Sequence, residues 1–446
     1  MNRGKSLFIS TILIFFTLVG SLKALEIIRD TELESFTNDI IKTLLIDSDI
    51  EAEDINIYFI NSDQVNAFVT GGTNIFINTE LIIQANDYRE YAAVIAHELA
   101  HILGGHVFRT SEEISNISGK AMPIYLLGII GLITGAAEAG FAGVMVGQAA
   151  VTDTFTYHSR TQEAAADQKA VSILCSSMID ASYLTRFLEG LEVSKLNIES
   201  KNKNYRSTHP LPQNRISWIE SAMNQGESCD FEKDKVLEKR FDLLKAKLFG
   251  FTHSHSETMA VYDQNNNKGL YATAVSSYLN GDHSQSIKNL EKLIENNNNN
   301  PFFKELIGEI FFVNQKYDDA IYFQRGAMND LNSDNDIYMM MLGNYLLSTE
   351  EKEKVNESIG YLKKSIQINS RNAYSWYLLA KAYAYMDNIS SANYATAERY
   401  FLIGEKMLSY DFALKALKGI EENTPEWYRT YDLIEILQKE VSTNTN

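Results

Sequence analysis

The sequence of 446 residues is poor in basic charge, in cysteine and in proline. Its 40 Lys and Arg residues are outnumbered by 58 Asp and Glu, so the formal net charge is −18. There is no basic stripe interleaved with aromatic side chains, which excludes a nucleic-acid-binding role. Prolines number only five, and 45% of the residues are hydrophobic. The chain can therefore bury a large core, and its length predicts two domains or three.

The apolar run near the N-terminus, residues 7–20, is shorter than the roughly 20 apolar residues that a membrane-spanning helix needs. Basic residues precede it, and the small residues Ser21 and Ala24 follow it, which is typical of a secretory signal. No cysteine lies near the expected cleavage point, so a lipoprotein is not expected. We predict that residues 1–24 are a cleaved signal peptide; an uncleaved anchor is the alternative.

The sequence contains two cysteines, Cys175 and Cys229. In an oxidising compartment these two side chains can pair with each other. Cys175 also ends the apolar helical stretch 171–175, where a buried free thiol fits equally well. The sequence leaves both alternatives open.

The most informative stretch of the sequence is His-Glu-Leu-Ala-His at residues 97–101. On a helix, His97 and His101 project from one face and can bind one metal ion, while Glu98 is turned toward a bound water. The surrounding helix, residues 91–103, is apolar on nearly every side. Burying these polar side chains is costly unless they share a partner such as a metal. The context therefore favours a zinc site over a solvated helix face.

A catalytic zinc site needs a third protein ligand and a fourth position that is open to water. Glu163 is the candidate ligand, because the alanines after it let its helix pack closely against the motif helix. Asp167 shares its face and can accept the ring N–H of a ligand histidine, which fixes the tautomer of that ring. Glu98 is then the general base that takes a proton from the attacking water.

The oxyanion that develops during peptide hydrolysis also needs an electrophilic partner, and Tyr157, Arg160 and His209 are the available groups. His209 stands out because a stiff Pro-Leu-Pro segment follows it and a polar stretch, 197–207, precedes it. It either binds the zinc as a fourth ligand in a closed resting site or stabilises the oxyanion. Two further histidines are predicted to have supporting or structural roles: His106 and His158.

The residues before the motif helix predict a helix at 25–45 and short strands at 55–60, 67–69 and 74–77. A small antiparallel sheet would then precede the metal helix. In such an enzyme an edge strand can receive the substrate backbone, and residues 71–76 are the best candidate for it. A plain structural hairpin is the alternative.

Residues 121–151 are apolar and rich in glycine, and Glu138 is their only charged residue. The glycines permit close helix approach, but Glu138 divides the segment into arms too short to span a membrane. We predict an apolar helical hairpin. It either makes peripheral contact with a membrane or packs against the protease domain over its cleft.

From about Gly269 onward the sequence changes to helices separated by Asn- and Asp-rich turns, after a polar stretch at 253–268 that is typical of a linker. Aligning Ile287 with Ile321 also matches Ser286 with Ala320, and the offset equals the tetratricopeptide period. Residues 376–383 reproduce most of the repeat's W-x2-L-G-x2-Y pattern, with Ala in place of Gly. We predict about four helix pairs.

These motifs resemble a zinc peptidase family that includes HtpX, the CAAX prenyl proteases and the periplasmic BepA-type proteases. The resemblance covers most of residues 25–446, and the expected signal and repeats are most similar to the BepA type. It rests on Asn66-Ala-Phe with Gly71-Gly72, on Ile77-Asn-Thr-Glu-Leu81, on the metal motif with His106 and Arg109, on Ser159-Arg160-x-x-Glu163-x-x-x-Asp167 and on Thr208-His209-Pro210-Leu-Pro212.

The resemblance implies that one Zn2+ per chain is bound by three ligands: His97, His101 and Glu163. It also implies that Glu98 is the catalytic base and that His209 is a regulatory or transition-state histidine. We expect Asp167 and Arg160 to support the ligands.

We therefore expect an α+β zincin-like (gluzincin) metalloprotease domain at residues 25–262, followed by an all-α tetratricopeptide-repeat solenoid at 263–446. The expected function is that of a periplasmic zinc metalloendopeptidase. It would cleave misfolded or stalled proteins and assist outer-membrane β-barrel assembly, with the repeats contacting the assembly machinery. The alternative is a chaperone or scaffold that acts through the repeats, with latent proteolysis. The intact ligand set with Glu98 favours the enzyme.

Overall fold

A computed structural model describes residues 26–70, 72–106, 160–193, 209, 215–225, 231, 233–297 and 299–444. The expected signal peptide and the apolar segment 121–151 lie outside these residues, as does Cys229. Cys175 is disulfide-bonded, which excludes the free thiol. Within the described ranges, no helix combines the length and the apolar character that crossing a membrane requires.

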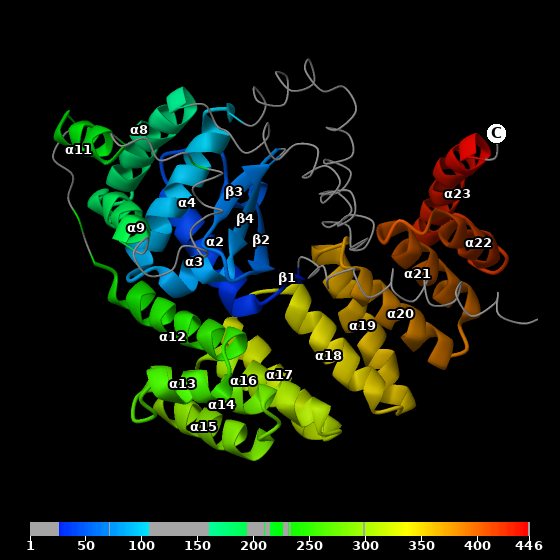
Figure 1. Cartoon of the computed structure of the whole chain (residues 1–446). Coiled ribbons are helices and arrows are strands. Elements are labelled where there is room, and N and C mark those ends of the chain that lie inside the picture. The colour runs from blue at the N-terminus through cyan, green and yellow to red at the C-terminus, as the bar shows by residue number, and fades with distance from the viewer. Residues whose placement is uncertain are drawn as a thin grey trace, which may run out of the picture.

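The N-terminal half is built on a four-stranded sheet in the order β1-β2-β4-β3 (Figure 1). Its strands are β1 (Glu26–Ile28), β2 (Asn56–Asn61), β3 (Ala67–Thr70) and β4 (Asn74–Asn78). The three strands predicted from the sequence are confirmed. The sheet is mixed rather than antiparallel, because β2 and β4 run parallel with Tyr58 opposite Phe76.

Two sequence predictions about this sheet are wrong. The edge strands are β1 and β3, whereas β4, which overlaps the predicted edge segment 71–76, lies between β2 and β3 and pairs with β3 in the antiparallel hairpin that was the alternative. Residues 75–77 of β4 are all buried, as expected of an interior strand that is covered on both faces. The predicted helix at 25–45 begins only after β1, which pairs with β2. Helix α2 (Thr31–Leu44) starts where the Asp30 side chain accepts a hydrogen bond from the Leu33 amide.

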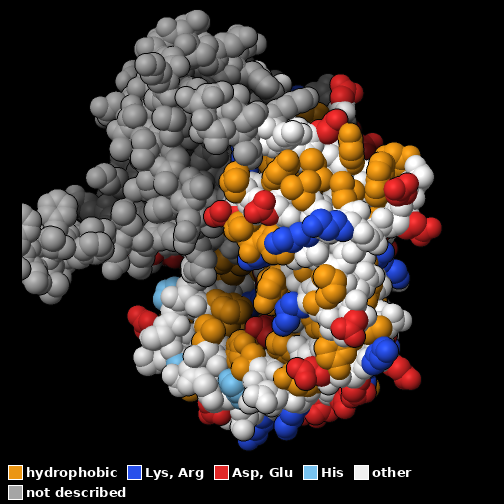
Figure 2. Space-filling view, turned by 90° about the vertical axis from the view of Figure 1, so that its right-hand side faces the viewer, with side chains coloured by type: hydrophobic (Ala, Val, Ile, Leu, Met, Phe, Trp, Pro, Cys, Tyr) orange, Lys and Arg blue, Asp and Glu red, His pale blue; other side chains and the backbone are white. Residues whose placement is uncertain are grey.

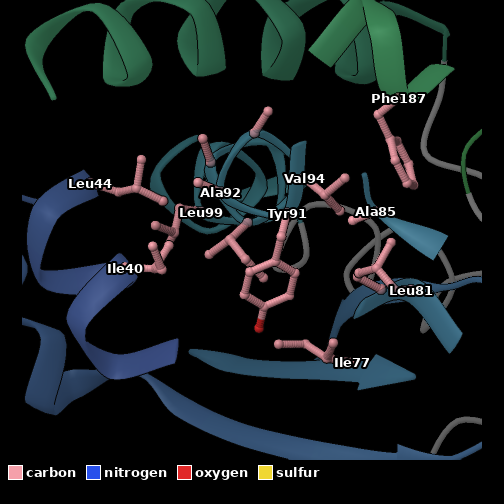
Figure 3. Packing of buried hydrophobic residues seen from close by; sticks show 14 of the residues in the cluster. Ile40, Leu44, Ile77, Leu81, Ala85, Tyr91, Ala92, Val94, Leu99 and Phe187 are labelled. Carbon is pink, nitrogen blue, oxygen red and sulfur yellow. The ribbon is translucent and has the colours of Figure 1, made fainter. Parts of the chain in front are cut away.

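Helix α4 (Tyr88–Leu103), which carries the metal motif, is the centre of the N-terminal core. It packs against β3, α2, α8 (Arg160–Ser176) and α9 (Ser182–Val193). Figure 3 shows Tyr91 and Leu99 of this helix among the buried side chains of α2, the sheet and α9. The Tyr91 hydroxyl lies 2.8 Å from that of Thr37, so even its polar end is satisfied. The motif is therefore held on a rigid, fully packed helix.

Shorter elements complete this half of the molecule: a 3-10 turn at Ala52–Asp54, α3 (Thr79–Gln84), α11 (Arg215–Gln225) and α12 (Lys235–Thr252). The stretch 253–268, which we predicted to be a linker, contains α13 (His255–Val261). A capping box starts this helix, because Ser254 and Glu257 each bond the other's backbone amide. The linker prediction is therefore wrong.

The C-terminal region consists of helices that follow one another in antiparallel pairs (Figure 1). They are α14 (Asn267–Leu279), α15 (His283–Asn296), α16 (Pro301–Val313), α17 (Tyr317–Leu331), α18 (Asp336–Ser348), α19 (Lys352–Ile368), α20 (Ala373–Tyr385), α21 (Ile389–Leu402), α22 (Lys406–Ala416) and α23 (Pro425–Asn444). The starts of α14 and α16, and likewise those of α15 and α17, are separated by the same offset that aligns Ile287 with Ile321. The described residues thus contain five pairs here, one more than the sequence predicted.

A buried polar junction joins the two halves of the molecule. The Lys247 ammonium of α12 lies 2.6 Å from an Asp30 oxygen and 3.3 Å from a Glu32 oxygen. Arg29 reaches across to Asp336 at the start of α18, with a shortest N–O distance of 3.0 Å. Helices α12 and α14 approach closely at Gly250, where a Cβ atom would lie 2.5 Å from the Ala272 carbonyl oxygen. The helical region is therefore packed directly onto the N-terminal half.

Candidate metal centre

Helix α4 places His97, Glu98 and His101 inside the protein, each with no exposed surface. The helical spacing of four residues brings the Nε2 atoms of His97 and His101 to 3.1 Å from each other. Two neutral ring nitrogens with facing lone pairs repel at this distance unless they share a cation. The helix thus brings together two atoms that could bind a metal ion.

Helix α8 brings Glu163 to the same point. Its Oε1 atom lies 3.2 Å from His101 Nε2, and its Oε2 atom lies 3.5 Å from His97 Nε2. The close approach of α8 to α4 depends on small residues, since Ala166 and Ala170 are completely buried where the helices meet. Of the three alanines expected to have this role, only Ala166 is buried, whereas Ala164 is half-buried and Ala165 is exposed.

His209, from the segment before α11, completes the cluster. Its Nδ1 atom lies 3.4 Å from His97 Nε2 and 3.3 Å from Glu163 Oε1. Its Nε2 atom lies 3.1 Å from the carbonyl oxygen of Ala67 on the edge strand β3. A carbonyl oxygen can only accept, so Nε2 carries the proton and Nδ1 presents a lone pair. The atom that faces His97 and Glu163 is thus Nδ1.

The donor set of this cluster fits a tetrahedral metal ion. The four buried groups His97, His101, Glu163 and His209 each offer one ligand atom, and these atoms all lie within 4.8 Å of one another. Ligand atoms about 2.0–2.1 Å from a tetrahedral zinc ion are about 3.3 Å apart. Four of the distances between donor atoms are 3.1, 3.2, 3.3 and 3.4 Å. Imidazole nitrogen and carboxylate oxygen are ordinary zinc donors.

A second layer of buried charge holds the donor set in position. Asp167 Oδ1 lies 3.0 Å from His97 Nδ1, and both oxygens of this carboxylate accept hydrogen bonds from Arg215, at 2.7 and 2.9 Å. Arg215 Nη1 also lies 3.3 Å from Glu163 Oε2. The Arg215 side chain is 1% exposed, among the largest fully buried side chains of the described residues.

Sequence reasoning missed Arg215. It is the first residue of α11, six residues after His209, and nothing in its spacing or composition singles it out. The only available signal was indirect. Two buried carboxylates, Glu163 and Asp167, require a buried cation, and an arginine can bind both through its planar fork.

The other candidate residues have mixed outcomes. His106 is buried with its Nδ1 atom 3.0 Å from His101 Nδ1, which places it behind a candidate ligand. Arg160 begins α8, but its side chain is outside the described part of the structure. Tyr157 and His158 lie outside the described residues altogether.

The buried charges call for a divalent cation. Glu98, Glu163 and Asp167 are three buried carboxylates, and they face the single guanidinium of Arg215. A divalent ion would leave the site neutral when all three carboxylates are ionised. Three of their oxygens make no hydrogen bond among the described residues: both oxygens of Glu98 and Oε2 of Glu163. Their printed contacts are ionic, at 3.3 Å from His209 Nε2 to Glu98 Oε1 and at 3.3 Å from Arg215 Nη1 to Glu163 Oε2.

The two carboxylates at the centre differ in pKa. Burial raises the pKa of Glu98, and the neighbouring His209 and His97 offset this only in part. Burial also acts to raise the pKa of Glu163, but the neighbouring imidazoles of His209, His101 and His97 outweigh it and hold that pKa well below its usual range. Glu163 is therefore an anionic ligand candidate, whereas Glu98 can exchange a proton.

Comparison with known proteins agrees with this geometry. Residues 29–223 match peptidase family M48. The chain is 23% identical over 390 residues to the beta-barrel assembly-enhancing protease of Escherichia coli (strain K12), covering 85% of this chain and 77% of that protein.

Two further relatives match less than half of this chain. The beta-barrel assembly-enhancing protease of Yersinia pestis is 28% identical over 202 residues, which are 45% of this chain and 40% of that protein. The bovine (Bos taurus) mitochondrial metalloendopeptidase OMA1 is 25% identical over 188 residues, which are 39% of this chain and 34% of that protein. The resemblance inferred from the sequence motifs is confirmed.

Proposed function

This chain is a metalloprotease with a peptidase family M48 domain at residues 29–223, and we propose that it is a zinc endopeptidase with one Zn2+ per chain. The proposed ligands are His97, His101 and Glu163. The observation that carries the proposal is the set of donor distances of 3.1–3.4 Å, which matches the edges of a tetrahedral zinc site. Its substrates are proteins.

Glu98 is the proposed general base. When bound, zinc supplies Lewis acidity that polarises the scissile carbonyl and acidifies water. Glu98 accepts the proton of the attacking water and passes it to the leaving amine. Burial raises its pKa, which suits a group that must hold the proton between these two steps. Its nearest charged neighbour is His209, whose Nε2 atom lies 3.3 Å from Glu98 Oε1.

Asp167 and Arg215 are proposed to fix the ligands in position. The Asp167 carboxylate accepts the Nδ1 proton of His97 at 3.0 Å, which leaves Nε2 of that ring to face the metal. Arg215 in turn anchors Asp167 through two hydrogen bonds and balances the charge of Glu163. Arg160 is retained as a supporting residue on the strength of the sequence motif alone.

His209 is proposed to be a fourth ligand of a closed resting state. Four protein ligands leave no position for water, so His209 has to leave before hydrolysis begins. Its Nε2–H contacts the Ala67 carbonyl on the edge strand β3, where a substrate strand would pair. A substrate backbone that takes over this carbonyl would remove the contact that orients the ring. In the alternative role, His209 stays near the site and stabilises the oxyanion.

The remaining parts of the chain have proposed roles that rest on the sequence and on a named relative. We assign residues 1–24 to a signal peptide, 25–262 to a zincin-like protease domain and 263–446 to a tetratricopeptide solenoid. A relative named for enhancing β-barrel assembly aligns over 77% of its length, which supports a role in the assembly and quality control of outer-membrane β-barrel proteins in the periplasm.

The repeats would contact the assembly machinery. The segment 121–151 would make peripheral contact with the membrane. The alternative function is that of a chaperone or scaffold with latent proteolysis.

The substitution Glu98→Gln in the full chain tests the proposal. It keeps the shape of the side chain and the zinc ligands but removes the base. Cleavage of an unstructured protein such as casein should fall at least about 100-fold, while zinc stays bound. Lost cleavage with unchanged activity in a client-assembly assay would favour the scaffold, and unchanged cleavage would contradict the role of Glu98 as the base.

A further inference from the structure

Helix α20 has an outward face of stacked tyrosines followed by a lysine. Tyr374 and Tyr377 are 49% and 38% exposed, with ring centroids 5.8 Å apart, and the exposed Lys381 follows one turn later. Spacings of three and four residues place these side chains on one face of the helix. The opposite face buries Trp376 and Leu379 in the core of the repeat. The two tyrosines are therefore not used to build that core.

The ring of Tyr377 lies beneath two cations. Arg399, from the partner helix α21, has its guanidinium carbon 5.2 Å from the ring centroid, and Lys381 Nζ lies 5.8 Å from it. The same guanidinium lies 5.4 Å from the ring of Tyr400. These contacts hold the two cations over aromatic rings and leave the N–H donors of both side chains available for hydrogen bonds.

Lys381 and Arg399 lack a carboxylate partner, unlike two cations nearby. Arg429 pairs with Glu398 at 2.7 Å, and Lys363 lies 3.5 Å from a Glu426 oxygen. Within the described ranges, no carboxylate lies within 4.0 Å of Lys381 or Arg399. Lys415 likewise lies over the Phe412 ring with no ion pair in these ranges, but the Tyr377 ring carries two such cations.

We propose that Tyr374, Tyr377, Lys381 and Arg399 form a docking surface for an extended peptide segment that carries carboxylates beside aromatic side chains. Arg399 binds a carboxylate through its fork, and Lys381 contributes a second charge. The tyrosine rings pack against the aromatic side chains of the peptide. From Tyr374 to Lys381 the helix rises about 10 Å, which is the length of about three residues of extended chain.

The charge of the surroundings favours a peptide over other anionic partners. A nucleic acid would be repelled by the net charge of the chain, because it engages many phosphates at once. Figure 2 shows hydrophobic side chains gathered on one face of the molecule, with Lys, Arg, Asp and Glu side chains among them. A short acidic and aromatic segment matches such a mixed surface, since each carboxylate can meet a cation while its neighbours bury apolar area.

The inference deepens the proposed partner-binding role of the helical region and does not depend on the metal site. The test uses the full chain carrying Glu98→Gln, so that the probe is bound and not cleaved. The probe is a fluorescein-labelled octapeptide with two Phe and two Asp residues, and the control peptide has Asn in place of both Asp residues. Fluorescence anisotropy gives the two dissociation constants.

The acidic peptide should bind at least about tenfold more tightly than the Asn peptide, and raising the salt concentration should reduce the difference. Arg399→Gln and Tyr377→Ala should each weaken binding about tenfold, and Lys381→Gln about threefold. Lys415→Gln is the matched control, because Lys415 lies over a different ring, Phe412, at 4.5 Å. It should leave the affinity unchanged, and circular dichroism confirms that each variant is folded.

The proposal would be overturned if the chain with an unchanged docking surface bound the acidic peptide and the Asn peptide with equal affinity. This result does not depend on whether any surface variant folds. The proposal would also be overturned if Lys415→Gln weakened binding as much as Lys381→Gln. The same conclusion would follow if vesicles containing phosphatidylglycerol, and not the peptide, bound through Arg399. If the wild-type chain failed to cleave protein, the proposed metal site would be contradicted, but the proposal for this docking surface would not be affected.

Discussion

Asp167 holds His97 from behind, with its Oδ1 atom 3.0 Å from the His97 Nδ1 atom, while both of its oxygens are bonded to Arg215. All three side chains are buried. In this structure the orientation of a candidate zinc ligand therefore depends on a carboxylate four residues from Glu163 on the same helix. The two carboxylates differ in their surroundings. Glu163 faces the donor cluster, whereas Asp167 faces the His97 ring and the Arg215 guanidinium.

We predict that Asp167→Asn weakens zinc binding about 10- to 100-fold without unfolding the protein. The Asn side chain is neutral and has one acceptor oxygen, so it cannot accept hydrogen bonds from both His97 and Arg215. The His97 ring then loses its fixed tautomer. Competition with a zinc-selective chelator measures the affinity. The matched control is Asp180→Asn, because Asp180 lies outside the site and bonds a backbone amide. An affinity equal to that of the wild type would remove Asp167 from its supporting role.

His209→Ala separates the two proposed roles of that side chain. If His209 closes the resting site, the variant should cleave a short unstructured peptide several-fold faster and bind zinc more weakly, since one ligand is lost. If it stabilises the oxyanion, kcat should fall about 100-fold or more, with little change in zinc affinity. Steady-state kinetics with a quenched fluorescent peptide distinguish these outcomes. We predict the first, because Nδ1 faces two of the other donor groups, His97 and Glu163.

The polar junction between the two halves should make stability depend on pH. Burial raises the pKa of Glu305 on α16 to about 8, an effect that Lys247 only partly offsets. A carboxyl whose pKa is higher in the folded protein stabilises the fold less as pH rises. The loss therefore falls between pH 4.5, the ordinary value, and about 8.

Glu305→Gln should reduce the loss of stability between pH 5.5 and pH 8.5 by roughly 1–3 kcal/mol, as measured by urea denaturation. The exposed Glu295, also in the helical region, provides the control substitution Glu295→Gln. If both variants keep the pH slope of the wild type, the junction carboxyl is not held neutral by burial.

Close packing of α12 on α14 predicts a large effect from a single methyl group. Gly250→Ala places a Cβ atom 2.5 Å from the Ala272 carbonyl oxygen and should destabilise the protein by about 1–3 kcal/mol. Gly360→Ala on α19 meets no atom within 4 Å and should stabilise its helix by about 0.5–1 kcal/mol. Thermal unfolding of both variants checks the pair. Equal effects would show that the two helices do not approach closely at Gly250.

Much of the metal centre could be predicted from local sequence. The four-residue spacing of His97 and His101 determines that they share a helix face, and the alanines near Glu163 indicate close packing against another helix. The constant offset between Ile287 and Ile321 likewise follows from helix pairs that repeat locally along the chain. In each case, residues that are near in sequence determine the structure.

The features that the sequence did not reveal depend on contacts between distant segments. The parallel pairing of β2 with β4 moves the edge of the sheet to β3, and no alternation of residues 71–76 specifies a partner. Arg215 is recognisable only once α11 has brought it to Asp167, 48 residues away in sequence. Helix α13 is a different case, because its capping box at Ser254 and Glu257 was visible in a stretch that composition alone made look like a linker.

The central claim is that one zinc ion is held by His97, His101 and Glu163. The most direct measurement is the zinc content of purified full chain by elemental mass spectrometry, for the wild type beside Glu163→Gln and Glu98→Gln. The account predicts one zinc per chain in the wild type and in Glu98→Gln, and severe loss in Glu163→Gln. Undiminished zinc in Glu163→Gln, or a wild-type protein that cleaves peptides after complete removal of metal, would contradict it.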